Sequence, residues 1–155
     1  MERLWAPWRS GYIQTVGEKS DCIFCEKAKS RNDRENFILK RGKYCFVILN
    51  VYPYNNGHLM IAPYRHISEI SHLRKCEMSE LFQFLKEYEW KLKKNLNPDG
   101  FNVGLNVGKV AGAGFEHHIH FHIVPRWEGD TNFMPVISDT KVISQSLEEV
   151  YNLLR

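Results

Sequence analysis

Residues that favour β-structure occur in two runs in the first half of the chain, at positions 44–51 and 57–62. The segment between them, residues 53–57, contains Pro, Asn and Gly, which are typical of turns. The two runs therefore predict a β-hairpin. Farther along, residues 101–107 alternate apolar and polar side chains, and this period of two predicts a half-buried strand.

Two other segments repeat their apolar residues every three or four positions, which predicts helices. In residues 78–96 the apolar positions are Met78, Leu81, Phe82, Leu85, Tyr88 and Leu92. Ser79 is a plausible start signal for this main helix, and the turn-forming residues 97–100 are a strong stop signal. About residues 140–154 form a second helical pattern. Strands grouped around one long helix predict an α+β fold with a mostly antiparallel sheet and a C-terminal helix.

Three histidines alternate with large apolar residues in the segment His118-Ile119-His120-Phe121-His122-Ile123-Val124. In an extended strand these three imidazoles lie on one face, with successive rings roughly 7 Å apart. Incidental surface histidines are the simpler explanation, but four of the seven histidines in the chain fall at positions 117–122. The clustering therefore favours a metal or catalytic site.

Composition narrows the class of protein. The chain has 155 residues, of which 43% are hydrophobic, so it is long enough for one domain with a proper core. Its net charge is +3, with both signs interspersed, which suits a small anionic ligand and argues against nucleic-acid binding through a basic patch. No apolar run has membrane-spanning length, and the N-terminus lacks a signal-peptide layout. We therefore expect no membrane association and a cytoplasmic location.

Cys22 and Cys25 are separated by two residues, a spacing that fits either half of a zinc site or a redox pair. A redox pair is expected beside a thioredoxin-like βαβ pattern, which the chain lacks, so zinc is favoured. Zinc requires two further ligands, and His66 and His118 are the candidates. His117 competes with His118, but in a regular strand its side chain faces the other way. Alternatively, the cysteines are ordinary buried thiols and His66 caps a loop.

The segment from His118 to Val124 resembles the signature of the histidine-triad (HIT) nucleotide hydrolases and transferases. The resemblance covers most of the chain from Cys22 to Ile137. It implies a single HIT-like domain over residues 1–155, which assembles as a homodimer. Within this domain we expect an N-terminal arm (1–20), a zinc-binding cysteine segment (21–26), and a C-terminal tail and helix (127–155). The start of the tail resembles the branch that holds fragile-histidine-triad hydrolases and bacterial diadenosine tetraphosphate phosphorylases.

The resemblance also implies roles for individual residues. The implied zinc ligands are Cys22, Cys25, His66 and His118, and a closed four-ligand site would be structural. His120 matches the histidine that becomes covalently nucleotidylated, and His122 would contact a phosphate oxygen or protonate the leaving group.

The implied nucleotide-binding residues lie on the first hairpin and on the glycine-rich loop before the triad: Asn50, His58, Asn106, Gly112 and Gly114, together with His122. Asn50 matches a residue that binds the ribose hydroxyls, and His58 a histidine close to the nucleophile. The loop is a plausible cradle for an anion. Many relatives carry Gln or a hydroxyl residue at the position of Gly114, so this departure weighs against plain hydrolysis.

The sequence therefore predicts a nucleotidyl hydrolase or transferase that cleaves dinucleoside polyphosphates through a nucleotidyl-histidine intermediate and releases a nucleoside monophosphate. Three alternatives remain. A diadenosine tetraphosphate phosphorylase would use phosphate as acceptor and yield ADP. A purine nucleoside phosphoramidase would use the same nucleophile, and a zinc-stabilised nucleotide-binding module would have no turnover.

Overall fold

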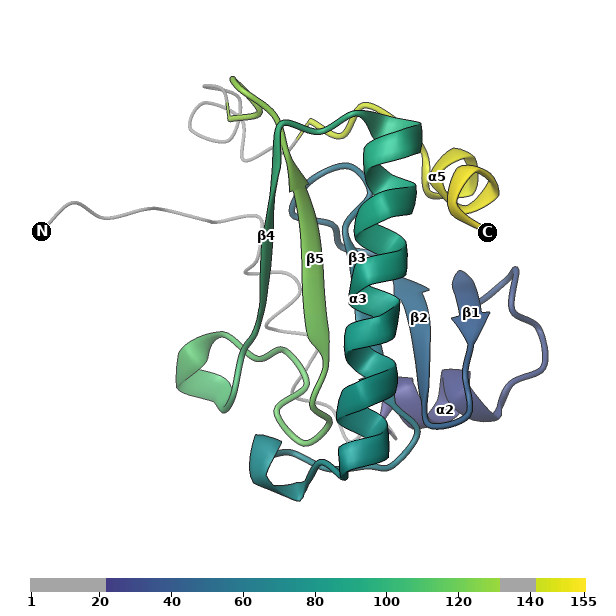
Figure 1. Ribbon diagram of the computed structural model, residues 1–155, viewed down its shortest axis with the longest axis vertical. Coiled ribbons are helices and arrows are strands. Elements are labelled where there is room, and N and C mark those ends of the chain that lie inside the picture. Colours follow the sequence, from purple (N-terminus) through teal and green to yellow (C-terminus); the bar gives the residue numbers. More distant parts are fainter. Residues whose placement is uncertain (1–21, 132–141) are drawn as a thin grey trace, which may run out of the picture.

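The computed structural model describes residues 22–131 and 142–155, and these form an antiparallel sheet of five strands (Figure 1). The strands are β1 (Ile38–Arg41), β2 (Cys45–Leu49), β3 (Leu59–Pro63), β4 (Gly100–Leu105) and β5 (Phe121–Arg126). Their order across the sheet is β1-β2-β3-β5-β4, and every neighbouring pair is antiparallel. The predicted α+β class and the hairpin between β2 and β3 are confirmed.

Helices lie on both faces of the sheet (Figure 1). The helices are α2 (Ile23–Lys29), α3 (Lys75–Leu96) and α5 (Leu147–Leu154), with short 3₁₀ helices η2 (Ile70–His72) and η3 (Lys109–Ala111). The long helix α3 crosses one face and contacts α5, whereas α2 packs on the opposite face. The predicted N-terminal arm (1–20) and residues 132–141 of the predicted C-terminal tail lie outside the described residues.

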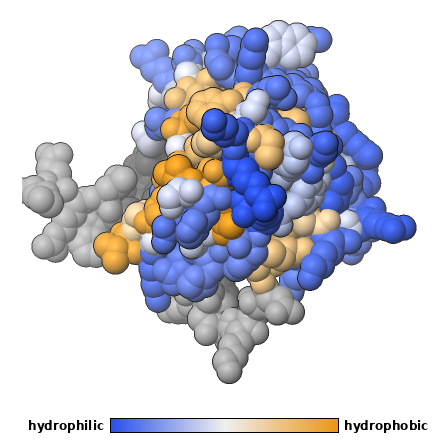
Figure 2. All heavy atoms as spheres, turned by 60° about the horizontal axis from the view of Figure 1, so that its bottom comes forward, coloured by the Kyte–Doolittle hydropathy of each residue, from blue (hydrophilic) through white to orange (hydrophobic). Residues whose placement is uncertain are grey.

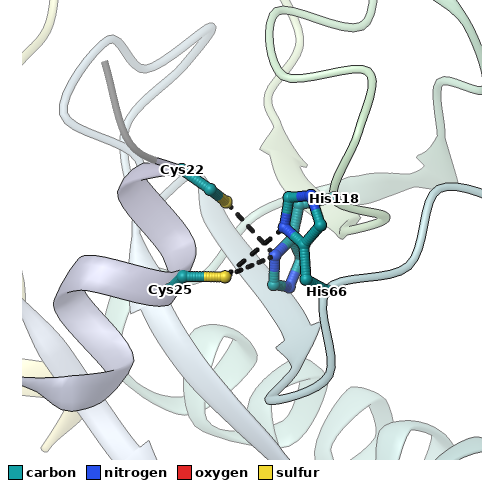
Figure 3. A group of neighbouring side chains, drawn as sticks. All are labelled: Cys22, Cys25, His66 and His118. Carbon is teal, nitrogen blue, oxygen red and sulfur yellow. Dashed lines mark hydrogen bonds between the residues drawn. The ribbon is translucent and has the colours of Figure 1, made fainter.

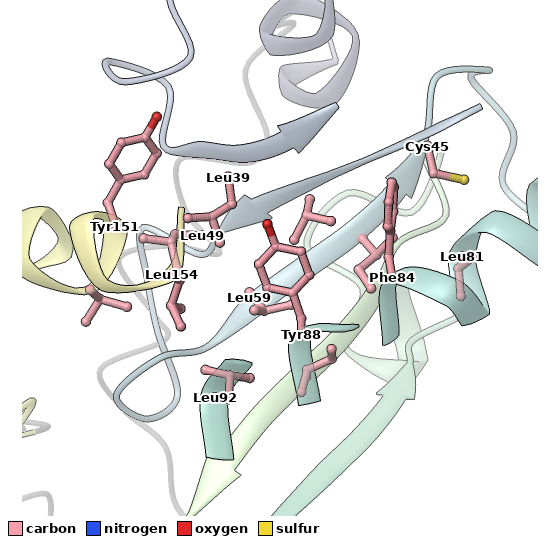
Figure 4. Packing of buried hydrophobic residues seen from close by; sticks show 14 residues of the cluster. Leu39, Cys45, Leu49, Leu59, Leu81, Phe84, Tyr88, Leu92, Tyr151 and Leu154 are labelled. Carbon is pink, nitrogen blue, oxygen red and sulfur yellow. The ribbon is translucent and has the colours of Figure 1, made fainter. Parts of the chain in front are cut away.

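Because side chains alternate along a strand, the central strands contribute to two separate cores. Val47 and Leu49 of β2 join the cluster beneath α3, where Tyr88 and Leu92 are fully buried (Figure 4). Phe46 and Ile48 instead join a second cluster with Phe24 of α2. Both faces of the sheet are thus covered, which explains why every residue of β2 and of β3 is buried.

The three histidines of the triad lie at and just before the start of strand β5. Ile123 belongs to the core under α3, so the neighbouring His122 points to the opposite face, the face of α2. His122 is paired with Met60 of β3 and with Gly104 of β4. The sheet pairing begins only at Phe121; His118 lies in a bend and His120 in irregular chain before it. The prediction of one continuous strand from residue 118 was therefore wrong at its start.

The main helix also begins earlier than predicted. It starts at Lys75, where the Glu77 carboxylate accepts a hydrogen bond from the Arg74 backbone N–H at 2.7 Å, so the start signal at Ser79 was wrong. Its buried stripe includes Phe84, whereas Phe82 is 64% exposed. Period alone does not say which of several adjacent apolar positions faces the sheet, and packing on β2 and β3 decides this.

Four smaller differences concern strands β1 and β4 and the C-terminal helix. Strand β1 was not predicted, because four residues of mixed polarity carry little signal before they pair with β2. Val107 lies beyond the end of β4, and the C-terminal helix begins only at Leu147. Strand β4 is more exposed than predicted, since it forms an edge of the sheet.

Within the described part of the chain, no helix combines the length and apolar character needed to cross a membrane.

Candidate active site and metal centre

The structure brings the four predicted metal ligands together: Cys22, Cys25, His66 and His118. Cys22 and Cys25 come from the start of α2, His66 from the segment after β3, and His118 from the triad. Figure 3 shows the two sulfurs facing the two imidazoles. Cys22 Sγ is 3.3 Å from His118 Nδ1, and Cys25 Sγ is 3.4 Å from His66 Nδ1. Residues up to 96 positions apart in sequence thus meet at one point.

The geometry of this cluster fits zinc. A tetrahedral site with ordinary Zn–S and Zn–N bonds places neighbouring sulfur and nitrogen ligands about 3.5 Å apart, and the sulfur–nitrogen distances above match that value. The Nε2–H of His118 is directed at the Pro63 carbonyl oxygen at 2.9 Å. This contact leaves Nδ1 with its lone pair towards the cysteines, as a metal ligand requires.

Electrostatics point the same way. Without a cation, burial and the adjacent Cys22 raise the pKa of the Cys25 thiol to about 11. Burial also lowers the pKa of the His118 imidazole to about 4. The imidazole is therefore neutral at neutral pH and able to coordinate a metal, and metal binding would displace the thiol proton.

His120 lies directly beside this centre. It is 5% exposed, and its Nδ1 is 2.8 Å from the His118 carbonyl oxygen. A carbonyl only accepts, so Nδ1 carries the proton and Nε2 carries the lone pair. Burial lowers the pKa of the His120 imidazole, and the hydrogen bond to the carbonyl opposes that shift. The result is a neutral imidazole whose second nitrogen is suited to nucleophilic attack.

A chain of hydrogen bonds determines which nitrogen of His122 carries its proton. The Tyr54 backbone N–H donates to His58 Nδ1 at 3.0 Å, so the proton of His58 lies on Nε2. That nitrogen is 2.9 Å from His122 Nδ1, which must then accept. His122 therefore carries its proton on Nε2, where it can be donated to a phosphate oxygen. Burial holds the pKa of His58 well below its usual value, with His122 adding to the shift, so His58 is neutral at neutral pH.

Two other predicted nucleotide-binding residues, Asn50 and Asn106, directly follow strands β2 and β4, which are not neighbours in the sheet. Asn50, which follows β2, accepts a hydrogen bond from the Tyr52 backbone at 2.9 Å. The Asn50 amide nitrogen lies 3.4 Å from His58 Nδ1, so these two predicted nucleotide-binding residues are in contact. Asn106 donates to the Gly112 carbonyl at 3.3 Å.

The glycine-rich loop folds into the 3₁₀ helix η3. The backbone N–H groups of Ala111, Gly112 and Ala113 donate to carbonyls within the loop, and that of Lys109 donates to Glu116 at 3.2 Å. These groups are therefore directed inward rather than towards an anion. The backbone N–H of Gly112 therefore has a partner within the loop, and an anion cradle around Gly114 stays a prediction.

Sequence reasoning missed Phe24. Its ring lies 5.1 Å from the His118 ring and 4.6 Å from the His120 ring, between centroids. The available signal was its place between the two cysteines, on the same turn of α2. His117, the competing ligand, is at the surface beside Glu116; it lies in a turn, not in the regular strand that was predicted.

The row of His118, His120 and His122 leading into an antiparallel sheet is the arrangement expected of a histidine-triad protein, and the comparisons agree. The family model for the HIT domain matches residues 31–129, more than half of the chain. The chain therefore belongs to the HIT domain family, as the triad segment predicted.

Individual relatives extend this assignment. The chain is 41% identical over 162 residues to the AP-4-A phosphorylase of Mycobacterium tuberculosis, a match covering 99% of this chain and 83% of the relative. It is 29% identical over 105 residues to the adenosine 5'-monophosphoramidase of Schizosaccharomyces pombe, covering 68% and 74%. A Zn-bound histidine triad family protein from Mycobacterium smegmatis has the same fold, with a TM-score of 0.67, 22% identity, and coverage of 87% and 91%.

Proposed function

We propose that this protein is a nucleotidyl hydrolase or transferase that acts on dinucleoside polyphosphates through His120. The observation that carries the proposal is the hydrogen bond from His120 Nδ1 to the His118 carbonyl, which leaves a neutral Nε2 as the nucleophile. The 41% identical relative, an AP-4-A phosphorylase, supports the class of substrate.

In the first step, His120 Nε2 attacks the phosphorus of the nucleoside monophosphate unit. A P–N bond forms, the P–O bond to the rest of the polyphosphate breaks, and the leaving phosphate takes the proton from His122 Nε2. In the second step, the acceptor attacks the same phosphorus, the P–N bond breaks, and the acceptor's proton returns to His122. One donor so placed typically contributes a factor of about 10² to 10⁴ in rate.

We propose structural zinc for the cluster of Cys22, Cys25, His66 and His118. Four protein ligands complete a tetrahedral shell, so the metal has no open position for substrate. Zinc supplies binding energy that holds α2 and the segment after β3 against the start of the triad. His118 is thereby a ligand, and the division of labour within the triad assigns catalysis to His120 and His122.

Inorganic phosphate is our proposed acceptor, in place of water. Gly114 has no side chain at a loop position where many relatives carry a donor, and the absence of that donor weighs against plain hydrolysis. The name of the mycobacterial relative supports phosphorolysis. Water as acceptor remains the competing hypothesis, and the products distinguish the two.

Diadenosine tetraphosphate incubated with phosphate at about its physiological millimolar level should give ADP and ATP, because phosphate oxygen then receives the adenylyl group. Hydrolysis would give AMP and ATP. Chromatography of the nucleotides measures both, and ¹⁸O-labelled phosphate should deliver label into ADP. Products and rate that do not respond to added phosphate would contradict phosphorolysis but leave nucleotidyl transfer intact.

Two other functions use the same residues. A phosphoramidase, supported by the relative from Schizosaccharomyces pombe, would also form an adduct on His120 but would cleave a P–N bond of its substrate. Turnover of adenosine 5'-phosphoramidate faster than that of the dinucleotide would favour it. A binding module without turnover would bind AMP and form no adduct.

We propose that two copies of the chain pair along strand β4. Among the described strands β4 is an edge that pairs with β5 alone, and Val103 on it is 53% exposed. On α3, Phe82 and Lys93 share a face, and Lys93 lies over the ring of Phe101 in β4. The exposed Phe82 ring therefore borders the same edge. Figure 2 shows apolar side chains grouped among hydrophilic ones on the face of the molecule that is turned forward from the bottom of Figure 1.

Phe82→Glu should convert the dimer to a monomer, because a buried, unpaired carboxylate opposes association at an apolar interface. Light scattering after gel filtration measures the mass. Leu153→Glu is the matched control, since Leu153 is 41% exposed on α5, whose Tyr151 contacts Phe37 next to β1 at the opposite edge of the sheet; it should leave the mass unchanged. A wild-type protein that is already monomeric at micromolar concentration would contradict the proposal.

With no membrane-spanning helix among the described residues, we propose a cytoplasmic location. Cysteines reserved for zinc support this, because zinc-bound thiolates persist in a reducing compartment.

A further inference from the structure

Helix α2 buries a single side chain, Phe24, which is 1% exposed. Cys22 and Cys25, the cysteines of the metal cluster, flank Phe24 in sequence. A helix of seven residues with one buried side chain gains little stability by itself. The position of Phe24 therefore depends on what holds the helix in place.

Two sets of contacts hold α2, one at each end. At its start, Cys22 and Cys25 face the imidazole of His118 at 3.3 and 3.6 Å. At its end, the Arg41 guanidinium donates to the carbonyls of Lys27 at 3.2 Å and of Ala28 at 2.7 Å. Free carbonyls at a helix C-terminus require such donors. The helix is thus clamped between the metal cluster and strand β1.

The ring of Phe24 contacts the metal cluster and the nucleophile at once. Its plane is tilted by 33° to the His118 ring and by 31° to the His120 ring. Phe24 covers one face of the His120 imidazole. The His122 ring makes an edge contact with the His120 ring, with 4.9 Å between the centroids. A buried ring against this face restricts rotation of the imidazole about its side-chain bonds.

We propose that Phe24 is a positioning residue that couples the metal centre to the nucleophile. It holds the His120 ring so that Nδ1 stays on the His118 carbonyl and Nε2 keeps its lone pair for attack. The inference rests on the proposed role of His120 and extends it: the metal acts on catalysis through α2 and this ring. Misplacement of a reacting atom by about 1 Å can cost about 10²-fold in rate, so a small loss of contact has a measurable effect.

The test is Phe24→Leu, which keeps an apolar side chain but removes the flat ring. Phe46→Leu is the matched control. Phe46 is fully buried in the same cluster and lies 6.5 Å from Phe24, so its loss perturbs the core to a similar extent without taking the ring from His120. If Phe24→Leu fails to fold, Phe24→Met takes its place.

Four quantities are measured on each folded variant. They are the zinc content, the single-turnover rate of adenylyl-enzyme formation, KM, and the tautomer of His120, which nitrogen-15 NMR of its ring reports. For Phe24→Leu we expect zinc near one equivalent per chain, a rate lowered about 10- to 100-fold, KM within about threefold, and mixed His120 tautomers. Phe46→Leu should keep the wild-type rate and tautomer.

An equal loss of rate in Phe24→Leu and Phe46→Leu would show that Phe24 acts only as a core residue, which would overturn the proposal. A raised KM with an unchanged rate would place Phe24 on the nucleobase instead, which also overturns it. Zinc removal by chelation tests the coupling between the metal centre and His120. It should mix the His120 tautomers in the wild type, but should cause little further mixing in Phe24→Leu, because both changes act through the same contact. The NMR signals need no substrate, so they test positioning even if the proposed reaction is wrong.

Discussion

His120→Asn should abolish turnover of diadenosine tetraphosphate, with at least about a 10⁴-fold loss, because no other group presents a neutral imidazole nitrogen to the phosphorus. Asn keeps a hydrogen-bond donor for the His118 carbonyl, so folding and AMP binding should persist. Rapid quench of the wild type, followed by peptide mass analysis, should place the adenylyl group on the peptide that contains His120.

His117→Asn is the matched control for this prediction. It makes the same chemical change three residues earlier in the chain, at a side chain that is 79% exposed, and should leave the rate within about twofold, as surface changes usually do. An adduct found on another residue, or turnover that continues in His120→Asn, would remove the mechanism. AMP binding without any adduct in the wild type would instead identify the binding module.

His122→Ala and His118→Ala should have opposite effects. Loss of the proton donor at His122 should lower kcat by about 10²- to 10⁴-fold with little change in Tm. Loss of the His118 ligand should lower zinc content well below one equivalent per chain and lower Tm by more than about 5 °C, because metal binding contributes to folding. Metal analysis, thermal unfolding and steady-state kinetics measure the three quantities.

Cys22→Ala provides the control for the metal half of this prediction. It removes a ligand from α2 without changing the triad, and it should reproduce the loss of zinc and of Tm seen in His118→Ala. Wild-type protein purified without zinc, together with an unchanged Tm in Cys22→Ala, would contradict the metal assignment. A destabilised His122→Ala beside a stable, slow His118→Ala would reverse the roles within the triad.

The fold class was predictable because it depends on local patterns. Two runs of β-forming residues around a turn predicted the hairpin of β2 and β3, and the stop at Asn97 was correct, since Asn97 adopts the left-handed conformation that ends the helix. The start of α3 and the buried face of the helix were not predictable in the same way. Phe82 and Phe84 are equally apolar, and only contact with the sheet buries one of them.

Residue types and spacing indicated the kind of chemistry, and the resemblance to the histidine-triad family supplied the four candidate metal ligands before their positions were known. Alternation along residues 118–122 also indicated that the three imidazoles belong together. These inferences rest on the properties of the side chains and on the period of extended chain, and both are readable from sequence. By itself, the sequence determined the fold class, the family and the kind of chemistry.

Only the tertiary structure decided how the groups are used. The proton positions on His120 and His122 follow from the carbonyl of His118 and from His58, which reach them through chain folding. The contact of Phe24 with two imidazoles likewise depends on how α2 packs against the sheet. Hydrogen bonds and ring contacts act only over a few ångströms between residues distant in sequence, so no local pattern of residues encodes them.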